Sequence, residues 1–207
     1  MRKSYFLTLE GPDGSGKSTI GKRINDELIS LGYDVVLTRE PGGTDIGEDI
    51  RKILLSKLNN NMSDIAESLL YAASRSQHVY EKIRPALEDG KIVLSDRFVM
   101  SSLAYQGGAR GLGMETVMAV NKFAMDGVYP DRIIFFDIEP EITLKRKTIG
   151  RDLDRLELEG LQFHNLVYNG YVEAINMFPE NVIKINANQT EDEVFNVCMK
   201  IIMEDLR

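Results

Sequence analysis

The most constraining feature of this chain is an eight-residue stretch near its start, residues 11–18, which reads GPDGSGKS. The stretch matches the pattern G-x-x-x-x-G-K-[ST] and lies between an apolar run, Tyr5–Leu9, and a segment with helical character from Lys17 onward. Such a loop works only where a strand leads into it and a helix N-terminus follows it, because the phosphate is bound jointly by inward-pointing backbone N–H groups of the loop and by the end of the helix. The sequence therefore predicts a strand, a phosphate-binding loop and a helix, in that order.

Two side chains in this stretch have defined chemical roles. Lys17 would reach the β and γ oxygens of a nucleotide, and the Ser18 hydroxyl would complete a Mg²⁺ shell. The alternative is a glycine-rich turn without a ligand, but such a turn does not need Lys followed by Ser at the start of a helix. We therefore expect a nucleotide site at this loop.

The rest of the chain alternates between short apolar runs and longer segments of helical periodicity. This alternation predicts an α/β fold with three layers, in which helices cover both faces of a five-stranded parallel sheet. The expected strands are Tyr5–Leu9, Val35–Thr38, Ile92–Ser95, Ile133–Asp137 and Val182–Ile185. The expected helices are Lys17–Leu31, Asp45–Ser56, Ser63–Glu88, Met114–Met125, Pro140–Lys147, Leu153–Met177 and Glu191–Leu206. Pro85 should end or kink the third of these helices.

Composition narrows the classes of protein that the chain can represent. The 207 residues contain no linker-like or repeated tract, so we expect a single domain, residues 1–207. A net charge of −7 argues against an extended nucleic-acid surface, which would need a basic face. The single Cys198 excludes a disulfide framework, and with two histidines a structural zinc site is not expected. The sequence shows no leader or membrane-spanning run, so we expect a cytoplasmic protein without a membrane partner.

A second group of charged residues follows the second expected strand. Arg39, Glu40 and Pro41 precede two glycines, and Arg51 lies on the helix that begins near Thr44. Such a turn can be simple punctuation with solvated charges. Because the carboxyl ends of parallel strands share one edge, these residues could instead hold a second anion beside the phosphate-binding loop.

Tyr71 and Arg75 lie four residues apart on the third helix and so share one of its faces. From spacing alone, a core tyrosine beside a surface arginine is the simpler interpretation. The functional interpretation is a clamp for a nucleobase, with the ring stacking on the base and the guanidinium donating to a carbonyl of the base.

The third expected strand ends in Asp96 and Arg97, where the acid could hold Mg²⁺ through water and the arginine could bridge two phosphates. A simple Asp–Arg pair closing the strand is the alternative.

Residues 101–107, SSLAYQG, offer hydroxyl and amide groups, and Gly107, Gly108, Gly111 and Gly113 suggest a flexible turn. Residues 145–157, KRKTIGRDLDRLE, form either a solvated loop or a mobile, arginine-rich lid over the nucleotide.

Taken together, these segments resemble the thymidylate kinase family of the bacterial type, a family of P-loop nucleoside monophosphate kinases. The resemblance runs over essentially the whole chain. The matching segments are EGPDGSGKST at residues 10–19, TREPGGT at 38–44, LLYAASR at 69–75, SDRF at 95–98, SSLAYQG at 101–107 and LDRLE at 153–157.

The resemblance implies transfer of the ATP γ-phosphate to dTMP, with Mg²⁺ as cofactor, in a homodimer. It implies ATP binding by Gly11, Pro12, Asp13, Gly14, Ser15, Gly16, Lys17, Ser18 and Thr19, with Mg²⁺ at Ser18 and Asp96. It implies that Arg39, Arg51 and Arg97 hold the acceptor phosphate, with Glu40 ordering that site beside a cis bond before Pro41. It further implies that thymine stacks on Tyr71 and accepts a hydrogen bond from Arg75, and that Ser102 and Gln106 contact the edge of the base. For the sugar, it implies that Tyr105 crowds the 2′ position and that Asp13 accepts a hydrogen bond from the 3′-OH.

Two positions depart from the common family pattern. The stacking residue is Tyr71 where phenylalanine is common, which leaves base stacking intact. The phosphate-binding loop lacks the basic residue of one subgroup, so the catalytic cation should come from the lid, with Arg151 and Arg155 as candidates. The other candidate catalytic residues are Lys17, Arg97 and Asp13.

Two alternative functions are compatible with the phosphate-binding loop. One is another nucleoside monophosphate or deoxynucleoside kinase, and the other is a nucleotide-dependent switch protein. A guanine-specific switch would normally carry an Asn-Lys-x-Asp sequence, which is absent here. The second cationic set, Arg39, Arg51, Arg75 and Arg97, distinguishes the classes, because only a kinase with a phosphorylated acceptor needs it.

Overall fold

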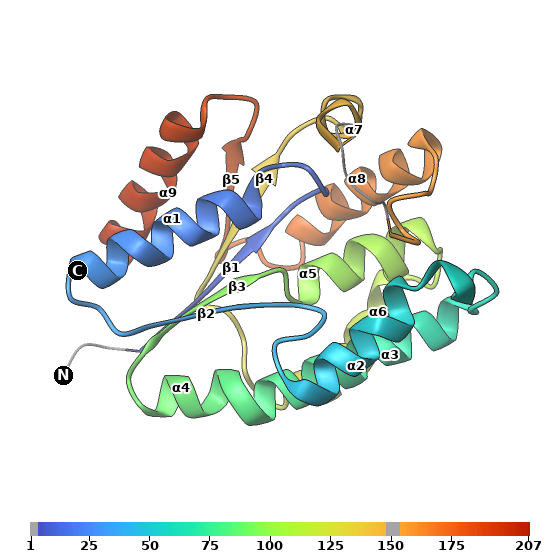
Figure 1. Ribbon diagram of the computed structural model, residues 1–207, viewed down its shortest axis with the longest axis horizontal. Coiled ribbons are helices and arrows are strands. Elements are labelled where there is room, and N and C mark those ends of the chain that lie inside the picture. Colours follow the sequence, from blue (N-terminus) through green and yellow to red (C-terminus); the bar gives the residue numbers. More distant parts are fainter. Residues whose placement is uncertain (1–3, 148–153) are drawn as a thin grey trace.

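A computed structural model of the chain describes residues 4–147 and 154–207. Its centre is a sheet of five parallel strands in the order β2-β3-β1-β4-β5 (Figure 1). The strands are β1 (Tyr5–Glu10), β2 (Val35–Arg39), β3 (Ile92–Asp96), β4 (Arg132–Asp137) and β5 (Val182–Asn186). Each contains the apolar run that predicted it, and because all are parallel, their carboxyl ends share one edge.

Alternate residues of the strands face two separate cores, as the geometry of a strand requires. On one face, Leu7 and Leu9 pack with α1 (Lys17–Ser30) and α9 (Glu191–Asp205). On the other face, Phe6 packs with the cluster formed by α4 (Arg84–Glu88), α5 (Val99–Ser102), α6 (Met114–Met125) and α8 (Leu161–Ile175). Figure 1 shows α1 and α9 on one side of the sheet and α4 and α6 on the other. The predicted three-layer α/β fold is confirmed.

The third expected helix is divided into three pieces. α3 (Asp64–His78) is followed by a π-helical turn, η2 (Val79–Ile83), and then by α4, whose first turn contains Pro85. Proline lacks an N–H and crowds the carbonyl four residues before it, and the wider π turn accommodates both effects. The predicted disruption is present, but it begins at Val79 and the chain continues as a helix beyond it.

Gly107 and Gly108 do not form the flexible turn that we expected. They lie in a π-helical segment, η3 (Leu103–Ala109), that packs closely on α8. A Cβ atom on Gly108 would lie 2.9 Å from the Cα atom of Gly170, and one on Gly170 would lie 2.6 Å from the carbonyl oxygen of Ala104. These glycines therefore allow two helical segments to touch, a requirement that the sequence pattern alone does not reveal.

The remaining elements border the carboxyl edge of the sheet. α2 (Asp45–Leu55) packs against α3 and is followed by a 3₁₀ turn, η1 (Lys57–Asn59), while α7 (Pro140–Lys147) packs against α8. The helix expected to start at Leu153 starts at Leu161 instead, and turns occupy most of residues 154–160. Within the described residues, no helix combines the length and apolar character needed to cross a lipid bilayer.

Candidate active site

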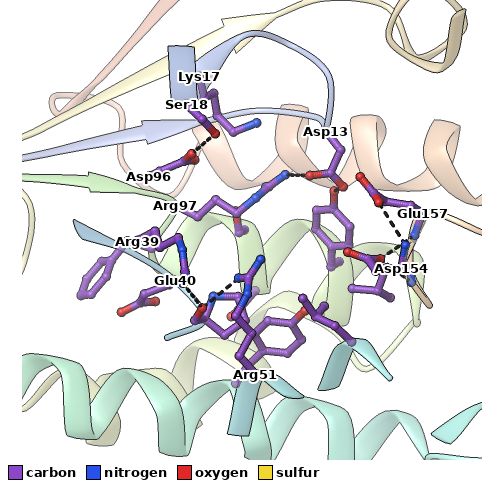
Figure 2. A pocket seen from close by; sticks show the side chains of 18 of the residues that line it. Asp13, Lys17, Ser18, Arg39, Glu40, Arg51, Asp96, Arg97, Asp154 and Glu157 are labelled. Carbon is purple, nitrogen blue, oxygen red and sulfur yellow. Dashed lines mark hydrogen bonds and ion pairs between the residues drawn. The ribbon is translucent and has the colours of Figure 1, made fainter. Parts of the chain in front are cut away.

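A cavity of about 650 Å³ lies at the carboxyl edge of the sheet and joins the two predicted anion sites (Figure 2). Residues of the phosphate-binding loop and residues that follow β2 and β3 line the same space. Among the predicted residues, those that line it are Asp13, Gly14, Gly16, Lys17, Ser18, Thr19, Arg39, Glu40, Pro41, Arg51, Tyr71, Arg75, Asp96, Arg97, Ser102, Tyr105 and Gln106. The fold therefore brings together residues from separate parts of the sequence, from residue 13 to residue 106.

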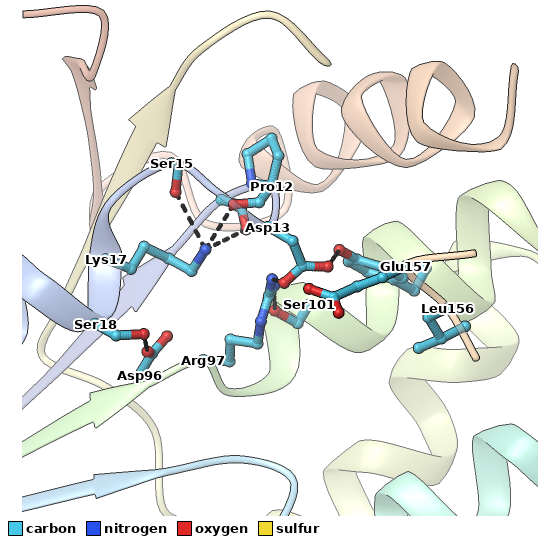
Figure 3. Close-up of polar contacts among 12 residues, drawn as sticks. Pro12, Asp13, Ser15, Lys17, Ser18, Asp96, Arg97, Ser101, Leu156 and Glu157 are labelled. Atoms are coloured by element: carbon cyan, nitrogen blue, oxygen red, sulfur yellow. Dashed lines mark hydrogen bonds and ion pairs between the residues drawn. The ribbon is translucent and has the colours of Figure 1, made fainter. Parts of the chain in front are cut away.

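The phosphate-binding loop encloses the ammonium group of Lys17. This group donates hydrogen bonds to the carbonyl oxygens of Gly11 and Pro12, at 2.9 and 2.7 Å, and to the Ser15 hydroxyl at 3.1 Å (Figure 3). Gly16, just before α1, has φ 94°, a left-handed conformation that glycine adopts without strain. Burial lowers the pKa of Lys17 to about 8, with a further contribution from the nearby Arg97 charge. An anionic phosphate would offset this unfavourable burial of charge.

The Ser18 hydroxyl donates to Asp96 Oδ2 at 2.5 Å, so the two predicted Mg²⁺ ligands lie side by side (Figure 3). The described residues contain no cluster of three or more His, Cys, Asp or Glu side chains that could hold a metal. This oxygen pair fits Mg²⁺, which commonly keeps several waters and binds one or two protein groups together with substrate phosphates.

Arg97 lies between the two halves of the cavity. Its backbone has φ 74°, uncommon for a residue other than glycine, and its side chain points toward Asp13 of the phosphate-binding loop. Its guanidinium pairs with Asp13 and donates to Ser101 Oγ at 2.9 Å and to the hydroxyl of Tyr171 at 2.7 Å. The Tyr105 hydroxyl donates to the other oxygen of Asp13 at 2.9 Å. Burial disfavours the charged form of Arg97 and so lowers its pKa. The negative charge of Asp13 is the largest of the effects that oppose burial, and together these effects place the pKa of Arg97 well above its ordinary value.

A buried carboxyl lies behind this arginine. Glu10, the last residue of β1, accepts from the backbone N–H of Phe98 at 2.7 Å and from Ser101 Oγ at 2.5 Å. Burial raises the pKa of Glu10 to about 7, although the Ser101 hydrogen bond and the Arg97 charge oppose the rise. Glu10 therefore supports the hydroxyl groups that hold Arg97.

The segment after β2 contributes the second group of cations. Arg39 forms a two-bond ion pair with Glu48, at 2.9 and 3.0 Å. Arg51 donates to the carbonyl oxygen of Pro41 at 2.9 Å, and the Glu40–Pro41 bond is cis, as the family resemblance implied. Burial lowers the pKa of Arg51, and the neighbouring Arg39 charge adds to this effect.

Arg75 is a buried residue, so the interpretation of this position as a surface arginine is wrong. Its Nε and Nη2 atoms donate to the same carboxylate oxygen of Glu40, at 2.8 and 2.7 Å. Its Nη1 atom donates to Ser102 Oγ at 3.0 Å and to the amide oxygen of Asn121. The second oxygen of Glu40 lies 3.0 Å from His78 Nδ1. Arg75 is therefore held in a fixed orientation at the cavity wall.

The structure does not place Arg155 at the phosphate-binding loop. Its Nε atom donates to the carbonyl oxygen of Leu54 at 2.9 Å, and its Nη2 atom pairs with buried Glu67 at 2.6 Å. A buried carboxylate is a strong competitor for a nearby guanidinium, because either charge alone would be costly to bury. The other lid candidate, Arg151, lies outside the described residues.

Several residues that line the cavity or support its walls were not predicted. Arg146, Asp154 and Glu157 line the cavity, and all three belong to the charged run that suggested a lid. Burial raises the pKa of Asp154, and the charges of Glu157 and Asp13 add to the rise, although hydrogen bonds from the backbone N–H groups of Glu157 and Leu156 oppose it. Tyr171 and Glu67 lie inside helical periodicity, where no local pattern distinguishes a site residue from a core residue.

Comparison with known proteins agrees with this geometry. The family model for thymidylate kinase matches residues 9–197. The chain belongs to the thymidylate kinase family. It is 54% identical to a thymidylate kinase of Finegoldia magna, over 95% of this chain and 97% of that protein. It is 51% identical to one of Clostridium novyi, over 94% and 96% of the two chains, and 47% identical to one of a Geobacillus species, over 99% and 98%. The residues matched by the family model include the phosphate-binding loop and the residues that follow β2 and β3.

Proposed function

We propose that this chain transfers the γ-phosphate of ATP to dTMP and produces dTDP and ADP. The observation that carries the proposal is the single cavity in which a phosphate-binding loop faces a second cationic group. A nucleotide-dependent switch needs only the first of these sites. A kinase whose acceptor is itself phosphorylated needs both, at one edge of one sheet.

On the donor side, residues 11–19 would hold the ATP phosphates through backbone N–H groups and Lys17. Mg²⁺, when bound at Ser18 and Asp96, would neutralise charge on the β and γ phosphates. In this proposal the hydrogen bonds of Lys17 to Gly11 and Pro12 keep its ammonium group within the loop, where the phosphate oxygens bind. Arg151 stays our candidate for the lid cation.

On the acceptor side, Arg39, Arg51 and Arg97 would hold the dTMP phosphate. Thymine would stack on Tyr71 and accept a hydrogen bond from Arg75, whose position is set by Glu40. Ser102 and Gln106 would contact the base edge, Tyr105 would crowd the 2′ position, and Asp13 would accept from the 3′-OH. The buried contacts of Arg75 support this assignment, because a side chain held in place loses little entropy on binding.

The reaction needs no strong general base, because the attacking phosphate oxygen of dTMP is already anionic at neutral pH. The work of the protein is to align the two phosphates and to neutralise their charge. Arg97 is the residue best placed for both tasks, since its guanidinium extends from the end of β3 toward Asp13 of the loop (Figure 3).

We also propose that the protein forms a homodimer through α3 and α6. The outer stripe of α3 and η2 exposes Ile65, Leu69 and Tyr80, at 64%, 53% and 73%, and Phe123 on the neighbouring α6 is 91% exposed. Exposed large apolar side chains on two packed helices are typical of an interface between protein chains. The opposite side of α3 carries Tyr71 and Arg75, so the dimer would support the acceptor site.

A coupled assay of ADP release tests the proposed function. With ATP and Mg²⁺, dTMP should be the preferred acceptor in a panel that also contains dUMP, dCMP, dGMP and AMP. Arg75→Ala should raise KM for dTMP by about 10- to 100-fold and leave KM for ATP nearly unchanged, since it removes a charge-assisted hydrogen bond to the acceptor alone. Normal affinity of this variant for dTMP would contradict the base clamp.

A further inference from the structure

The side chain of Glu67 contacts two parts of the molecule that the proposed mechanism leaves separate, the proposed base-binding site and the charged segment that contains Arg155. It lies in the first turn of α3, and its side chain is 1% exposed. Its Oε1 atom accepts from Gln106 Nε2 at 2.9 Å, and its Oε2 atom accepts from Arg155 Nη2 at 2.6 Å. Arg110 lies at 3.4 Å from both oxygens. One buried carboxylate thus contacts a predicted base-binding residue and two guanidinium groups.

The contact with Gln106 determines which way its amide points. A carboxylate flanked by two guanidinium groups can only accept hydrogen bonds, so the partner atom on Gln106 must be the donor Nε2. Gln106 is itself 1% exposed and lines the cavity. With one N–H of Nε2 bound to Glu67, the amide cannot reverse, and Oε1, which can only accept, is available to a ligand.

We propose that Glu67 is the residue that makes the acceptor site selective for the thymine or uracil ring over cytosine, by fixing the amide of Gln106 with Oε1 toward the base. This inference rests on the proposed function. Thymine and uracil present a donor, N3–H, beside the O4 acceptor, whereas cytosine presents an N3 acceptor beside an amino donor. Oε1 of Gln106 and the guanidinium of Arg75 complement the first pattern and oppose the second.

The two arginines have a supporting role in this arrangement. Arg155 and Arg110 keep a negative charge stable at a buried position, and without such partners a buried carboxylate would be strongly unfavourable. Arg110 is also shared with Asp64 at 3.4 Å and with Glu159 at 2.9 Å. Arg155 is therefore a positioning residue for Glu67 and, through it, for Gln106.

The test compares kcat/KM for dTMP, dUMP and dCMP between the full-length wild-type enzyme and the Glu67→Gln variant. An amide at position 67 can donate, so the Gln106 amide can reverse and present Nε2 to the base. The ratio of kcat/KM for dTMP over dCMP should then fall by about 10- to 100-fold, mainly through KM. The ratio for dTMP over dUMP should stay within about twofold, because both bases present the same N3–H and O4 pattern.

Asp64→Asn is the matched control. It alters a carboxylate in the same helical turn that contacts Arg110, and no hydrogen bond joins it to Gln106 in the described part of the chain. Both selectivity ratios of this variant should remain those of the wild type. If folded Glu67→Gln keeps the wild-type ratio of dTMP over dCMP, or if the two ratios change together, the proposal is overturned.

A second measurement covers the case in which Glu67→Gln does not fold. In ¹⁵N-labelled wild-type enzyme, the side-chain amide protons of Gln106, assigned by their loss in Gln106→Leu, should exchange with water much more slowly than those of exposed Gln189. Equal exchange rates would overturn the proposal. Failure of the wild-type enzyme to phosphorylate dTMP would instead refute the proposed function, and the exchange measurement would still report on the Glu67–Gln106 contact.

Discussion

At the scale of single residues, Lys17 shows most clearly how binding chemistry and folding stability conflict. Its ammonium group is buried among loop carbonyls, and its pKa is lowered to about 8, mainly by burial. Lys17→Ala should reduce kcat by about 10³-fold or more, because the γ-phosphate loses a cation in a preorganised site. Lys22→Ala, an exposed lysine on the same helix, should keep near-normal turnover in the same ADP-release assay. Substantial activity in Lys17→Ala would contradict the role assigned to the loop.

Glu10 should make the stability of the protein depend on pH. Its pKa of about 7 in the folded state, mainly due to burial, lies above the ordinary value of 4.5, so between these values the folded state binds more protons than the unfolded state. Stability should therefore fall as pH rises from about 5 to about 7 and level off above, with about 3 kcal/mol attributable to this group. Lys17 and Arg97 face Glu10, but the pKa values of both lie above this range.

Urea unfolding of the wild type and Glu10→Gln at pH 5, 6, 7 and 8 measures this contribution. The difference in unfolding free energy between the two proteins should change in favour of Glu10→Gln as pH rises, because the amide does not titrate. Parallel pH profiles would show that Glu10 does not carry the expected proton linkage.

The sequence indicated those cavity residues that lie at or shortly after the end of a strand. Arg39 and Arg97 each follow an apolar run closely, Lys17 ends the loop that follows another, and parallel strands bring such ends to one edge. The sequence did not reveal the ion pair of Arg155 with Glu67, because nothing in a charged run indicates which residue each charge will contact in the fold. Glu67, the partner that it found, lies inside a helical pattern and looks from the sequence like any polar residue in a first turn.

At the scale of elements, the close contact between α8 and η3 holds a segment that borders the proposed acceptor site. Gly170 lies against Ala104, and the same helical segment carries Tyr105 and Gln106. Gly170→Ala should lower stability by about 1–3 kcal/mol, although alanine favours a helix by about 1 kcal/mol, because a Cβ atom would meet the Ala104 carbonyl oxygen at 2.6 Å. KM for dTMP should rise as well, since η3 would have to shift.

Gly160→Ala is the control for this prediction, because a Cβ atom there would have nothing within 4 Å. Thermal melting and KM for dTMP should change little in this variant. If Gly170→Ala melts at the same temperature as the control, the packing argument fails. Periodicity could not reveal this contact, because it reports which face of a helix is buried and not how closely two backbones approach.

At the scale of the whole molecule, parallel strands and the alternation of elements were sufficient to predict the three layers. The strand order was not predicted, because it depends on which crossover each helix makes. The order β2-β3-β1-β4-β5 has β1 in the centre of the sheet, so the phosphate-binding loop emerges between the ends of β3 and β4. The proposed acceptor residues after β2 and β3 all lie to one side of it and line the same cavity as the loop, as the proposed transfer between two nucleotides requires.

The proposed dimer gives the last prediction at this scale. Leu69→Lys places a charge in the apolar stripe of α3, and burying that charge in an interface without a partner would be strongly unfavourable. Sedimentation velocity should show a dimer for the wild type and a monomer for this variant. Ile29→Lys is a close control, because Ile29 on α1 is 52% exposed and Leu69 is 53% exposed, yet α1 packs on the opposite side of the sheet from α3. A monomeric wild type, or loss of the dimer in both variants alike, would contradict this interface. Because α3 carries Tyr71 and Arg75 on its inner side, the monomeric variant should also bind dTMP more weakly than the control does.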